Sequence, residues 1–139
     1  MQVQINLMDP FDPAPGDGVE NNAKRPNLTD NKETTSWSTE SYVSPTFSSK
    51  PGKTGVGLTF SLAEEATMIK ITYTLTGWKG EVQKVTSDNT VVAVAQLGDS
   101  QQVNFSEPLS AGRLWFTQGA LLPNSTKYGV IIKEISFWR

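Results

Sequence analysis

The stretch TMIKITYTL (67–75) alternates apolar and polar side chains along its length. The apolar side chains that would share one face of an extended strand are Ile69, Ile71, Tyr73 and Leu75. The opposite face would carry Lys70, Thr72 and Thr74. A period of two is typical of a strand with one buried face. The stretch therefore predicts a half-buried β-strand.

Similar strand-like segments lie on both sides of this stretch. They cover 3–7, 55–62, 81–86, 91–96, 101–105, 113–118 and 128–138. Turn-forming Gly, Asn and Asp separate several of them, at 76–80, 87–90 and 97–100. The segment AEEA (63–66) is expected to form one helical turn. Eight to nine short strands in 139 residues predict a single all-β domain, an antiparallel sandwich or barrel spanning 1–139.

The composition excludes several classes of function. The chain contains no cysteine and no histidine, which removes thiol nucleophiles, the Ser-His-Asp triad and zinc sites built on these residues. The formal net charge is -2, and Lys24-Arg25 is the only adjacent basic pair, so no nucleic acid is expected as a partner. Nothing marks a catalytic pair of carboxylates, and the protein is not expected to be an enzyme.

The sequence also lacks signals for membrane insertion. No apolar run approaches the roughly 20 residues that span a bilayer. The first ten residues lack the basic and apolar regions of a signal peptide. The protein is therefore expected either to be cytosolic or to be a domain cut from a larger chain at Met1.

The region 9–54 differs from the rest, because it is rich in Asp, Pro, Gly, Asn, Ser and Thr and has little strand signal. A loop of this length inside a compact domain is usually functional or ligand-stabilised. Its acidic part, MDPFDPAPGDGVEN (8–21), is expected to be a solvated loop rather than a cation-binding one. Trp37 stands among polar residues, so the ring either clamps the loop by packing on the sandwich edge or awaits a ligand; clamping is favoured.

Part of this region resembles a known family. LTDNKETTSWSTE (28–40) resembles the signature of discoidin or galactose-binding-like domains at Asp30, Thr35 and Trp37, with Asn31 in place of the usual Gly. KEISFW (133–138) resembles the last strand of that family. The resemblance implies a jelly-roll β-sandwich.

Three blocks narrow the resemblance. FDPAPGDGVEN (11–21), TTSWSTESY (34–42) and KTGVGLTFSL (53–62) resemble the extracytoplasmic C-terminal domain of actinobacterial MviN-type membrane proteins, which are lipid II flippase-like. Related domains end some actinobacterial membrane kinases. The resemblance implies a soluble extracytoplasmic domain tethered to a membrane protein of peptidoglycan synthesis.

The same family often holds a structural calcium ion, which prefers oxygen ligands. Carried over, the ligands would be the carboxylates of Asp30 and Glu134, the Thr35 hydroxyl, and the carbonyls of Asn27 and Lys32. The ammonium of Lys32 could instead replace the ion by pairing with Asp30 or Glu134. A loop without a cofactor, held by hydrogen bonds, is the favoured interpretation, and calcium is the alternative.

Aromatic residues expected in loops are the candidates for ligand binding. They are Tyr42, Phe47, Trp78 and Tyr128. Sugars stack on exposed aromatic faces, and Trp78 in the turn TGWKG (76–80) is the best candidate for exposure, although core packing is the commoner role of such a ring.

Two functions remain open at this point. The leading one is a non-catalytic binding module for a glycan, a peptidoglycan precursor or an envelope protein, with the ligand class implied by the resemblance. The rival is a structural domain that docks on a protein and binds no small ligand. Exposed loop aromatics would favour the first, and one apolar surface patch would favour the second.

Overall fold

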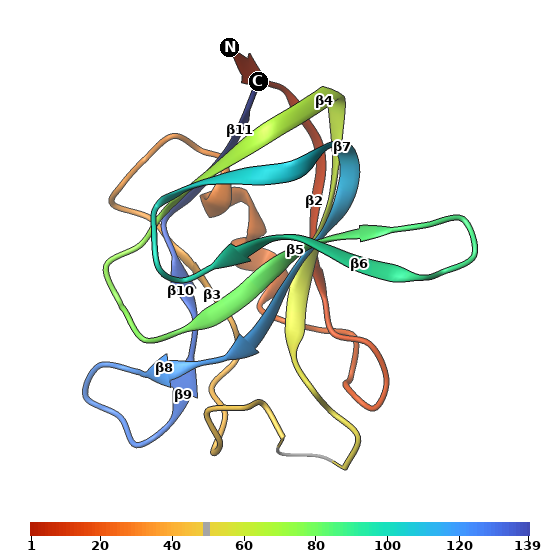
Figure 1. Ribbon diagram of the computed structural model, residues 1–139. Coiled ribbons are helices and arrows are strands. Elements are labelled where there is room, and N and C mark those ends of the chain that lie inside the picture. Colours follow the sequence, from red (N-terminus) through yellow and green to blue (C-terminus); the bar gives the residue numbers. More distant parts are fainter. Residues whose placement is uncertain (49–50) are drawn as a thin grey trace.

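The computed structural model describes residues 1–48 and 51–139, and it is an antiparallel jelly-roll β-sandwich (Figure 1). The strands are β1 (Gln2–Val3), β2 (Ile5–Phe11), β3 (Trp37–Ser38), β4 (Val56–Thr72), β5 (Lys79–Val85), β6 (Val91–Leu97), β7 (Gln102–Gln118), β8 (Ala120–Leu121), β9 (Tyr128–Gly129), β10 (Ile131–Ile132) and β11 (Glu134–Trp138). A short 3-10 helix, η1, covers Asn22–Leu28. The predicted all-β class is confirmed.

Two long strands, β4 and β7, carry the main sheet from one layer of the sandwich into the other. They pair first at 56–61 with 111–116 and again at 66–70 with 102–109, and the register shifts between the two stretches. β2, β5 and β6 extend the first stretch, and β1 and β11 extend the second. Such irregularities bend a strand, so a single seven-stranded sheet covers both sides of the core. Phe60 of one layer meets Phe137 of the other, with ring centroids 4.6 Å apart.

The stretch 67–75 has the predicted faces. Ile69, Ile71 and Tyr73 are buried, and Leu75 packs partly buried against the core. The prediction of a helical turn at 63–66 is wrong, because this segment continues β4 through its corner. The amide of Ala63 donates to the carbonyl of Gln4 at 2.9 Å, so the segment between β1 and β2 supplies a partner for this amide.

The predicted strand at 128–138 is divided into three short strands with different partners. β9 pairs with β8, β10 with β3, and β11 with β4. The pairing of β10 with β3 places Ile132 opposite Trp37 and ties the polar region 9–54 to the C-terminal part of the chain. No helix in the described residues is long and apolar enough to cross a membrane.

Trp37 is completely buried, as the predicted packing of its ring on the sandwich requires. The ring lies 6.2 Å from that of Phe116, between centroids, and the indole Nε1 donates to the backbone carbonyl of Glu20 at 3.0 Å. A tryptophan in polar sequence company is therefore an anchor here, since its apolar neighbours come from distant strands.

Replacing Trp37 with Ala should lower the free energy of unfolding by about 3–5 kcal/mol, the usual cost of truncating a buried aromatic ring. Chemical denaturation of both proteins measures the difference. Trp37→Phe should retain more of the stability, although it removes the hydrogen bond to Glu20. A change below about 1 kcal/mol in Trp37→Ala would contradict the anchoring role.

Candidate functional site

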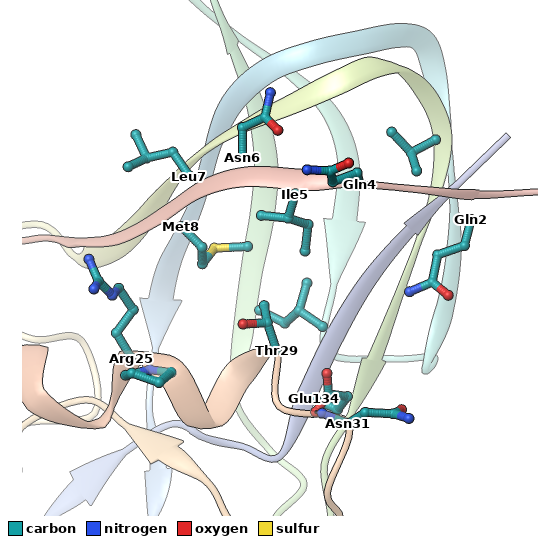
Figure 2. Close-up of a pocket in the computed structure, with 13 residues that line it drawn as sticks. Gln2, Gln4, Ile5, Asn6, Leu7, Met8, Arg25, Thr29, Asn31 and Glu134 are labelled. Carbon is teal, nitrogen blue, oxygen red and sulfur yellow. The ribbon is translucent and has the colours of Figure 1, made fainter.

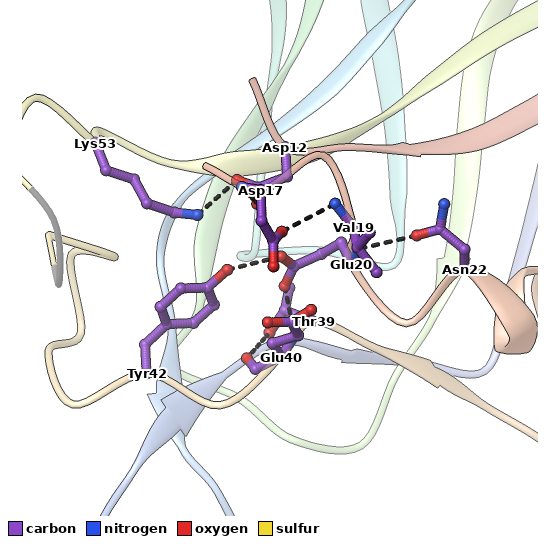
Figure 3. Close-up of polar contacts among 9 residues, drawn as sticks. All are labelled: Asp12, Asp17, Val19, Glu20, Asn22, Thr39, Glu40, Tyr42 and Lys53. Carbon is purple, nitrogen blue, oxygen red and sulfur yellow. Dashed lines mark hydrogen bonds and ion pairs between the residues drawn. The ribbon is translucent and has the colours of Figure 1, made fainter. Parts of the chain in front are cut away.

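The segment that follows β2 is organised around the carboxyl group of Glu20, which is 0% exposed (Figure 3). Its Oε1 accepts a hydrogen bond from the Tyr42 hydroxyl at 2.7 Å, and its Oε2 accepts one from the amide of Glu40. The backbone amide of Glu20 donates to Asn22 Oδ1 at 2.8 Å. Together with the bond from Trp37, these contacts join the loops around residues 20 and 40.

The environment of Glu20 favours its protonated form. Burial raises the pKa of this carboxyl to about 7 from its ordinary 4.5, because removal from water penalises the charge more than the hydrogen bonds from Tyr42 and Glu40 favour it. The nearby charges of Glu40 and Asp12 raise it further. Burial, and then the contact with Glu20, raise the pKa of the Tyr42 hydroxyl, which therefore remains a hydrogen-bond donor.

A buried ion pair lies beside this group. Lys53 Nζ contacts Asp12 Oδ1 at 2.5 Å, and the side chains are 5% and 3% exposed. The other carboxylate oxygen of Asp12 accepts from the amide of Asp17 at 3.1 Å. Gly16 lies so close that an added Cβ would fall 2.1 Å from Asp12 Oδ1. Buried ions persist only when paired and hydrogen-bonded, and removing one partner is costly.

These groups border a cavity of about 190 Å³, which we call the loop-end cavity. Its lining residues are Asp12, Asp17, Glu40, Ser41, Tyr42, Val43 and Lys53. They come from three separate segments, 12–17, 40–43 and residue 53, each within or beside one of the blocks on which the family resemblance rests. The expectation of a simply solvated acidic loop is wrong for Asp12 and Glu20, because Lys53 and Tyr42 supply partners inside the protein.

The structure brings three of the four candidate aromatics together. The rings of Tyr42 and Phe47 meet edge to face with centroids 4.9 Å apart. Tyr42 and Tyr128 exchange two backbone hydrogen bonds, of 2.9 and 2.8 Å. Phe47 is fully buried, Tyr42 is 7% exposed and Tyr128 is half-buried. Of these three residues, Tyr42 alone borders the loop-end cavity.

Trp78, the best candidate for an exposed ring, is buried, so core packing, the commoner role of such a ring, is its role here. The ring is 1% exposed and packs edge-on against Tyr73 and Phe116, at centroid distances of 5.0 and 5.6 Å. Gly77 takes a positive φ of 101°, which turns the chain so that Trp78 enters the core. A ring in this place cannot stack on a sugar.

The candidate calcium residues also converge in part. Asp30 accepts from the Lys32 amide at 2.9 Å and from the Thr35 hydroxyl at 2.6 Å, and Glu134 accepts from the Asn31 amide at 2.9 Å. The carboxyl groups of Asp30 and Glu134 lie close enough for each to shift the pKa of the other. Asn27 uses its side-chain amide to bind the Ser36 carbonyl at 2.8 Å and thereby braces the loop.

The two carboxyls differ in their affinity for a proton. Burial, and then the nearby Asp30 charge, raise the pKa of Glu134 to about 7, although a hydrogen bond from Asn31 favours its charged form. The Thr35 hydrogen bond, followed by the Lys32 amide and ammonium, lowers the pKa of Asp30. Lys32 forms no ion pair with either carboxyl, so its ammonium does not replace a metal by direct pairing, which was one of the alternatives that the sequence left open.

The oxygens of Asp30, Glu134 and Thr35 would fit a hard cation, with the Lys32 carbonyl nearby, since Thr35 Oγ1 also reaches that carbonyl at 3.3 Å. Among the described residues, however, no three Asp, Glu, His or Cys side chains group as a metal site. The hydrogen bonds from Asn31, Lys32 and Thr35 hold the two carboxyl groups in this loop.

A second, larger hollow of about 850 Å³ lies between the N-terminal strands and η1 (Figure 2). Ile5 and Met8 face it from β2, and Arg25, Thr29 and Glu134 border it from the other side. The cationic group at this hollow is the guanidinium of Arg25, whose side chain is 49% exposed and already pairs with Asp9. The residues that line the larger hollow include no buried ion pair like that of Lys53 and Asp12. The loop-end cavity is therefore the better candidate for a specific site.

Sequence reasoning missed Asp12, Glu40 and Lys53 as members of one site. Asp12 carried a usable signal, because it is followed by two glycines within six residues, Gly16 and Gly18, as expected where backbone must approach closely. Lys53 and Glu40 carried none, since their meeting depends on how the whole region 9–54 folds back.

Comparison with known proteins gives a similarity of fold. No family model matches the sequence, and no curated protein matches it either. Among solved structures, it is similar to CpGH89CBM32-5 of Clostridium perfringens, a carbohydrate-binding module determined in complex with GalNAc-β-1,3-galactose. The TM-score is 0.53 and the identity 15%, and the match covers 95% of each chain. At this identity the likeness establishes the fold, and it leaves the parentage in MviN-type proteins as a hypothesis.

The raised pKa of Glu20 predicts that the domain loses stability as pH rises. The folded state holds this proton up to about pH 7 and the unfolded chain only to about 4.5, so the free energy of unfolding should fall between these values. The change should be on the order of 2–3 kcal/mol. Urea denaturation at pH 5 and pH 8 measures it.

Glu20→Gln provides the control, because an uncharged amide keeps the shape of the group. This variant should lose less stability than the natural protein between pH 5 and pH 8, and Glu134 should account for part of the slope that remains. Equal slopes in the two proteins would show that Glu20 is charged in the fold throughout this range.

Proposed function

We propose that this domain is a non-catalytic glycan-binding module and that the loop-end cavity receives one sugar ring. The observation that carries the proposal is the convergence of Asp12, Tyr42 and Lys53, from three distant segments, on one small cavity with charges held in place by burial. Recognition of sugar hydroxyls requires hydrogen-bond donors and acceptors at fixed positions in the cavity. A polar group of the protein or of the sugar that is buried without a hydrogen-bond partner weakens binding.

The charges of the cavity favour a sugar without an acidic group. Three carboxylates border it, from Asp12, Asp17 and Glu40, against the single ammonium of Lys53. Carboxylates accept hydrogen bonds from hydroxyls, and they would repel a uronic or sialic acid. The glycan bound to the structural neighbour, GalNAc-β-1,3-galactose, is also uncharged and supports this choice of ligand.

The setting that we propose follows from the sequence resemblance. The domain would lie outside the cytoplasm, tethered to a membrane protein of cell-envelope synthesis, and would bind a peptidoglycan-related glycan or an envelope partner. The full-length gene tests this setting directly. Transmembrane helices encoded next to the domain support it, and a gene that encodes this domain alone, without a secretion signal, overturns it.

A second candidate function is protein docking without a small ligand, either in an envelope protein or in the ectodomain of an actinobacterial membrane kinase. The observation that favours it is the hairpin of β5 and β6, which projects from the body of the fold (Figure 1). Three valines near its tip, Val85, Val91 and Val92, are 42%, 41% and 43% exposed. An exposed apolar tip is suited to contact with another protein.

We also propose that the Asp30 loop is closed without a metal. A protonated Glu134 donating to the Asp30 carboxylate would take the place of the cation, since one proton shared by two carboxyls removes their repulsion. The loop would then contribute to shape rather than to ligand affinity.

Titration with N-acetylgalactosamine tests the glycan proposal. Binding should shift the backbone amide NMR signals of 40–43 and of Lys53. Glu40→Gln should weaken binding at least fivefold, because it removes a carboxylate acceptor while leaving the backbone amide that bonds Glu20. Glu33→Gln, at an exposed carboxylate outside the cavity, is the matched control and should bind normally.

Two results would count against sugar binding at this cavity. One is saturation of the protein with N-acetylgalactosamine, galactose and N-acetylglucosamine in turn without any shift at 40–43. The other is equal affinity of the natural protein and Glu40→Gln for the sugar that binds. Either would favour the docking function.

Millimolar calcium should leave the melting temperature at pH 6.5 unchanged, and a chelator should have no effect. A bound cation would stabilise the folded state by mass action, by about 2.7 kcal/mol at a hundredfold excess over its dissociation constant. Differential scanning calorimetry would detect that shift. A calcium-dependent rise that Asp30→Asn abolishes would contradict the metal-free loop and establish a calcium site.

A further inference from the structure

The face of the main sheet that points away from the core carries an ordered set of side chains. Leu114 and Phe116 are fully buried, so Trp115 between them points to the opposite face, where it is half-buried. Strand register places Phe11, Gly57, Trp115, Glu81 and Gln96 side by side in one row across β2, β4, β7, β5 and β6. Arg113 and Gln83 face each other in the next row.

Two glycines of the chain allow Trp115 to lie flat on this face. A Cβ at Gly57 would lie 3.3 Å from Trp115 Cε3, and one at Gly55 would lie 2.8 Å from Cε2 and 3.0 Å from Cζ2. These atoms are spread across the six-membered ring, so one side of the ring rests on the backbone at the start of β4. Side chains at either glycine would lift the ring off the sheet.

Phe11 and Arg113 pack against Trp115 on the same face of the sheet. The Phe11 ring is tilted by 58° to Trp115 with centroids 5.9 Å apart. The guanidinium carbon of Arg113 lies 5.0 Å from the Phe11 centroid and 5.8 Å from that of Trp115. The guanidinium is thereby held between the rings with its remaining N–H groups available as donors.

A chain of hydrogen bonds fixes the polar side chains next to the rings. Arg113 Nε donates to Gln83 Oε1 at 2.6 Å, and Gln83 Nε2 donates to Glu81 Oε1 at 2.8 Å. Gln96 Nε2 reaches Glu81 Oε2 at 3.4 Å. In this hydrogen-bonded series the positive charge of Arg113 balances the negative charge of Glu81, so these side chains are polar without net charge.

We propose that Phe11, Glu81, Gln96, Arg113 and Trp115, here the sheet platform, bind an extended uncharged oligosaccharide at a site separate from the loop-end cavity, with the buried Gln83 holding Arg113 and Glu81 in place. A flat aromatic ring fits the apolar C–H face of a sugar, and the adjoining donors and acceptors fit its hydroxyls. The row crosses four inter-strand gaps of about 4.8 Å, roughly 19 Å in all, which suits a chain of sugars rather than one.

The balance of charge and the fixed polar groups decide in favour of a glycan over a protein. A protein-docking face would be a continuous apolar patch, whereas only two aromatic rings stand here among polar side chains. The proposal goes beyond the proposed function, because it concerns a different surface and a longer ligand.

The test uses the hexamer of β-1,4-linked N-acetylglucosamine, the hexamer of β-1,4-linked glucose, and their monosaccharides. At least one hexamer should bind at least tenfold more tightly than its monosaccharide. It should shift the NMR signals of the Trp115 indole N–H and of Arg113 Nε–H. Trp115→Ala should weaken hexamer binding tenfold or more, and Trp115→Phe, which keeps a ring over the glycines, should weaken it less.

Trp138→Ala is the matched control, because Trp138 is also half-buried under a cation, with Lys70 Nζ 4.2 Å from its ring centroid. This variant should bind the hexamer normally. Glu40→Gln should also keep hexamer binding at the platform, whereas Trp115→Ala should keep binding of N-acetylgalactosamine at the cavity. Failure of one site is thus distinguishable from failure of the other.

The proposal is overturned if neither hexamer binds, if binding leaves the Trp115 and Arg113 signals unshifted, or if Trp115→Ala binds as well as the natural protein. Circular dichroism and melting curves establish that each variant is folded. If Trp115→Ala is unfolded, Trp115→Phe and the NMR shifts of the natural protein decide the matter.

Discussion

The buried carboxyl of Glu20 is the constraint on which the irregular part of this domain depends. Between the end of β2 and residue 48, the described residues contain one two-residue strand, β3, and the short helix η1, so few of their backbone groups are paired in regular structure. Glu20 replaces such pairing by taking hydrogen bonds from Tyr42 and Glu40 on its side chain and from Trp37 on its carbonyl. Because a buried polar group without partners is costly, the loops must adopt the arrangement that supplies them.

The same arrangement creates the chemistry of the loop-end cavity. Tyr42 is oriented by Glu20, Lys53 is oriented by Asp12, and both lie beside the same space of about 190 Å³. Polar groups that are held in place before a ligand arrives lose little freedom on binding, which favours recognition of a small polar molecule. The sheet platform reaches a similar result by another route, since glycines and strand register position Trp115 without any loop.

Much of the sandwich could be predicted from the sequence, because period-two patterns such as 67–75 report directly which face is buried. The same rule applied to RLWFTQ (113–118) places Trp115 opposite Leu114 and Phe116, although this consequence was not among the sequence predictions. The sequence left two roles open for Trp78, and the ring is buried because the glycine before it redirects the chain so that a turn residue points inward. The loop-end cavity was beyond prediction, since Asp12 and Lys53 are 41 residues apart and meet only through tertiary folding.

Native-state hydrogen exchange below pH 7 tests the central role of Glu20 most directly. The Trp37 indole N–H and the Glu40 amide both donate to Glu20, and the Ile71 amide, which donates to the Gln101 carbonyl at 2.9 Å, reports on the main sheet. If the region folds as one unit with the sandwich, all three hydrogens should require opening free energies within about 1 kcal/mol of that for global unfolding. Exchange of the Trp37 and Glu40 hydrogens by small local openings, with Ile71 still protected, would contradict the account.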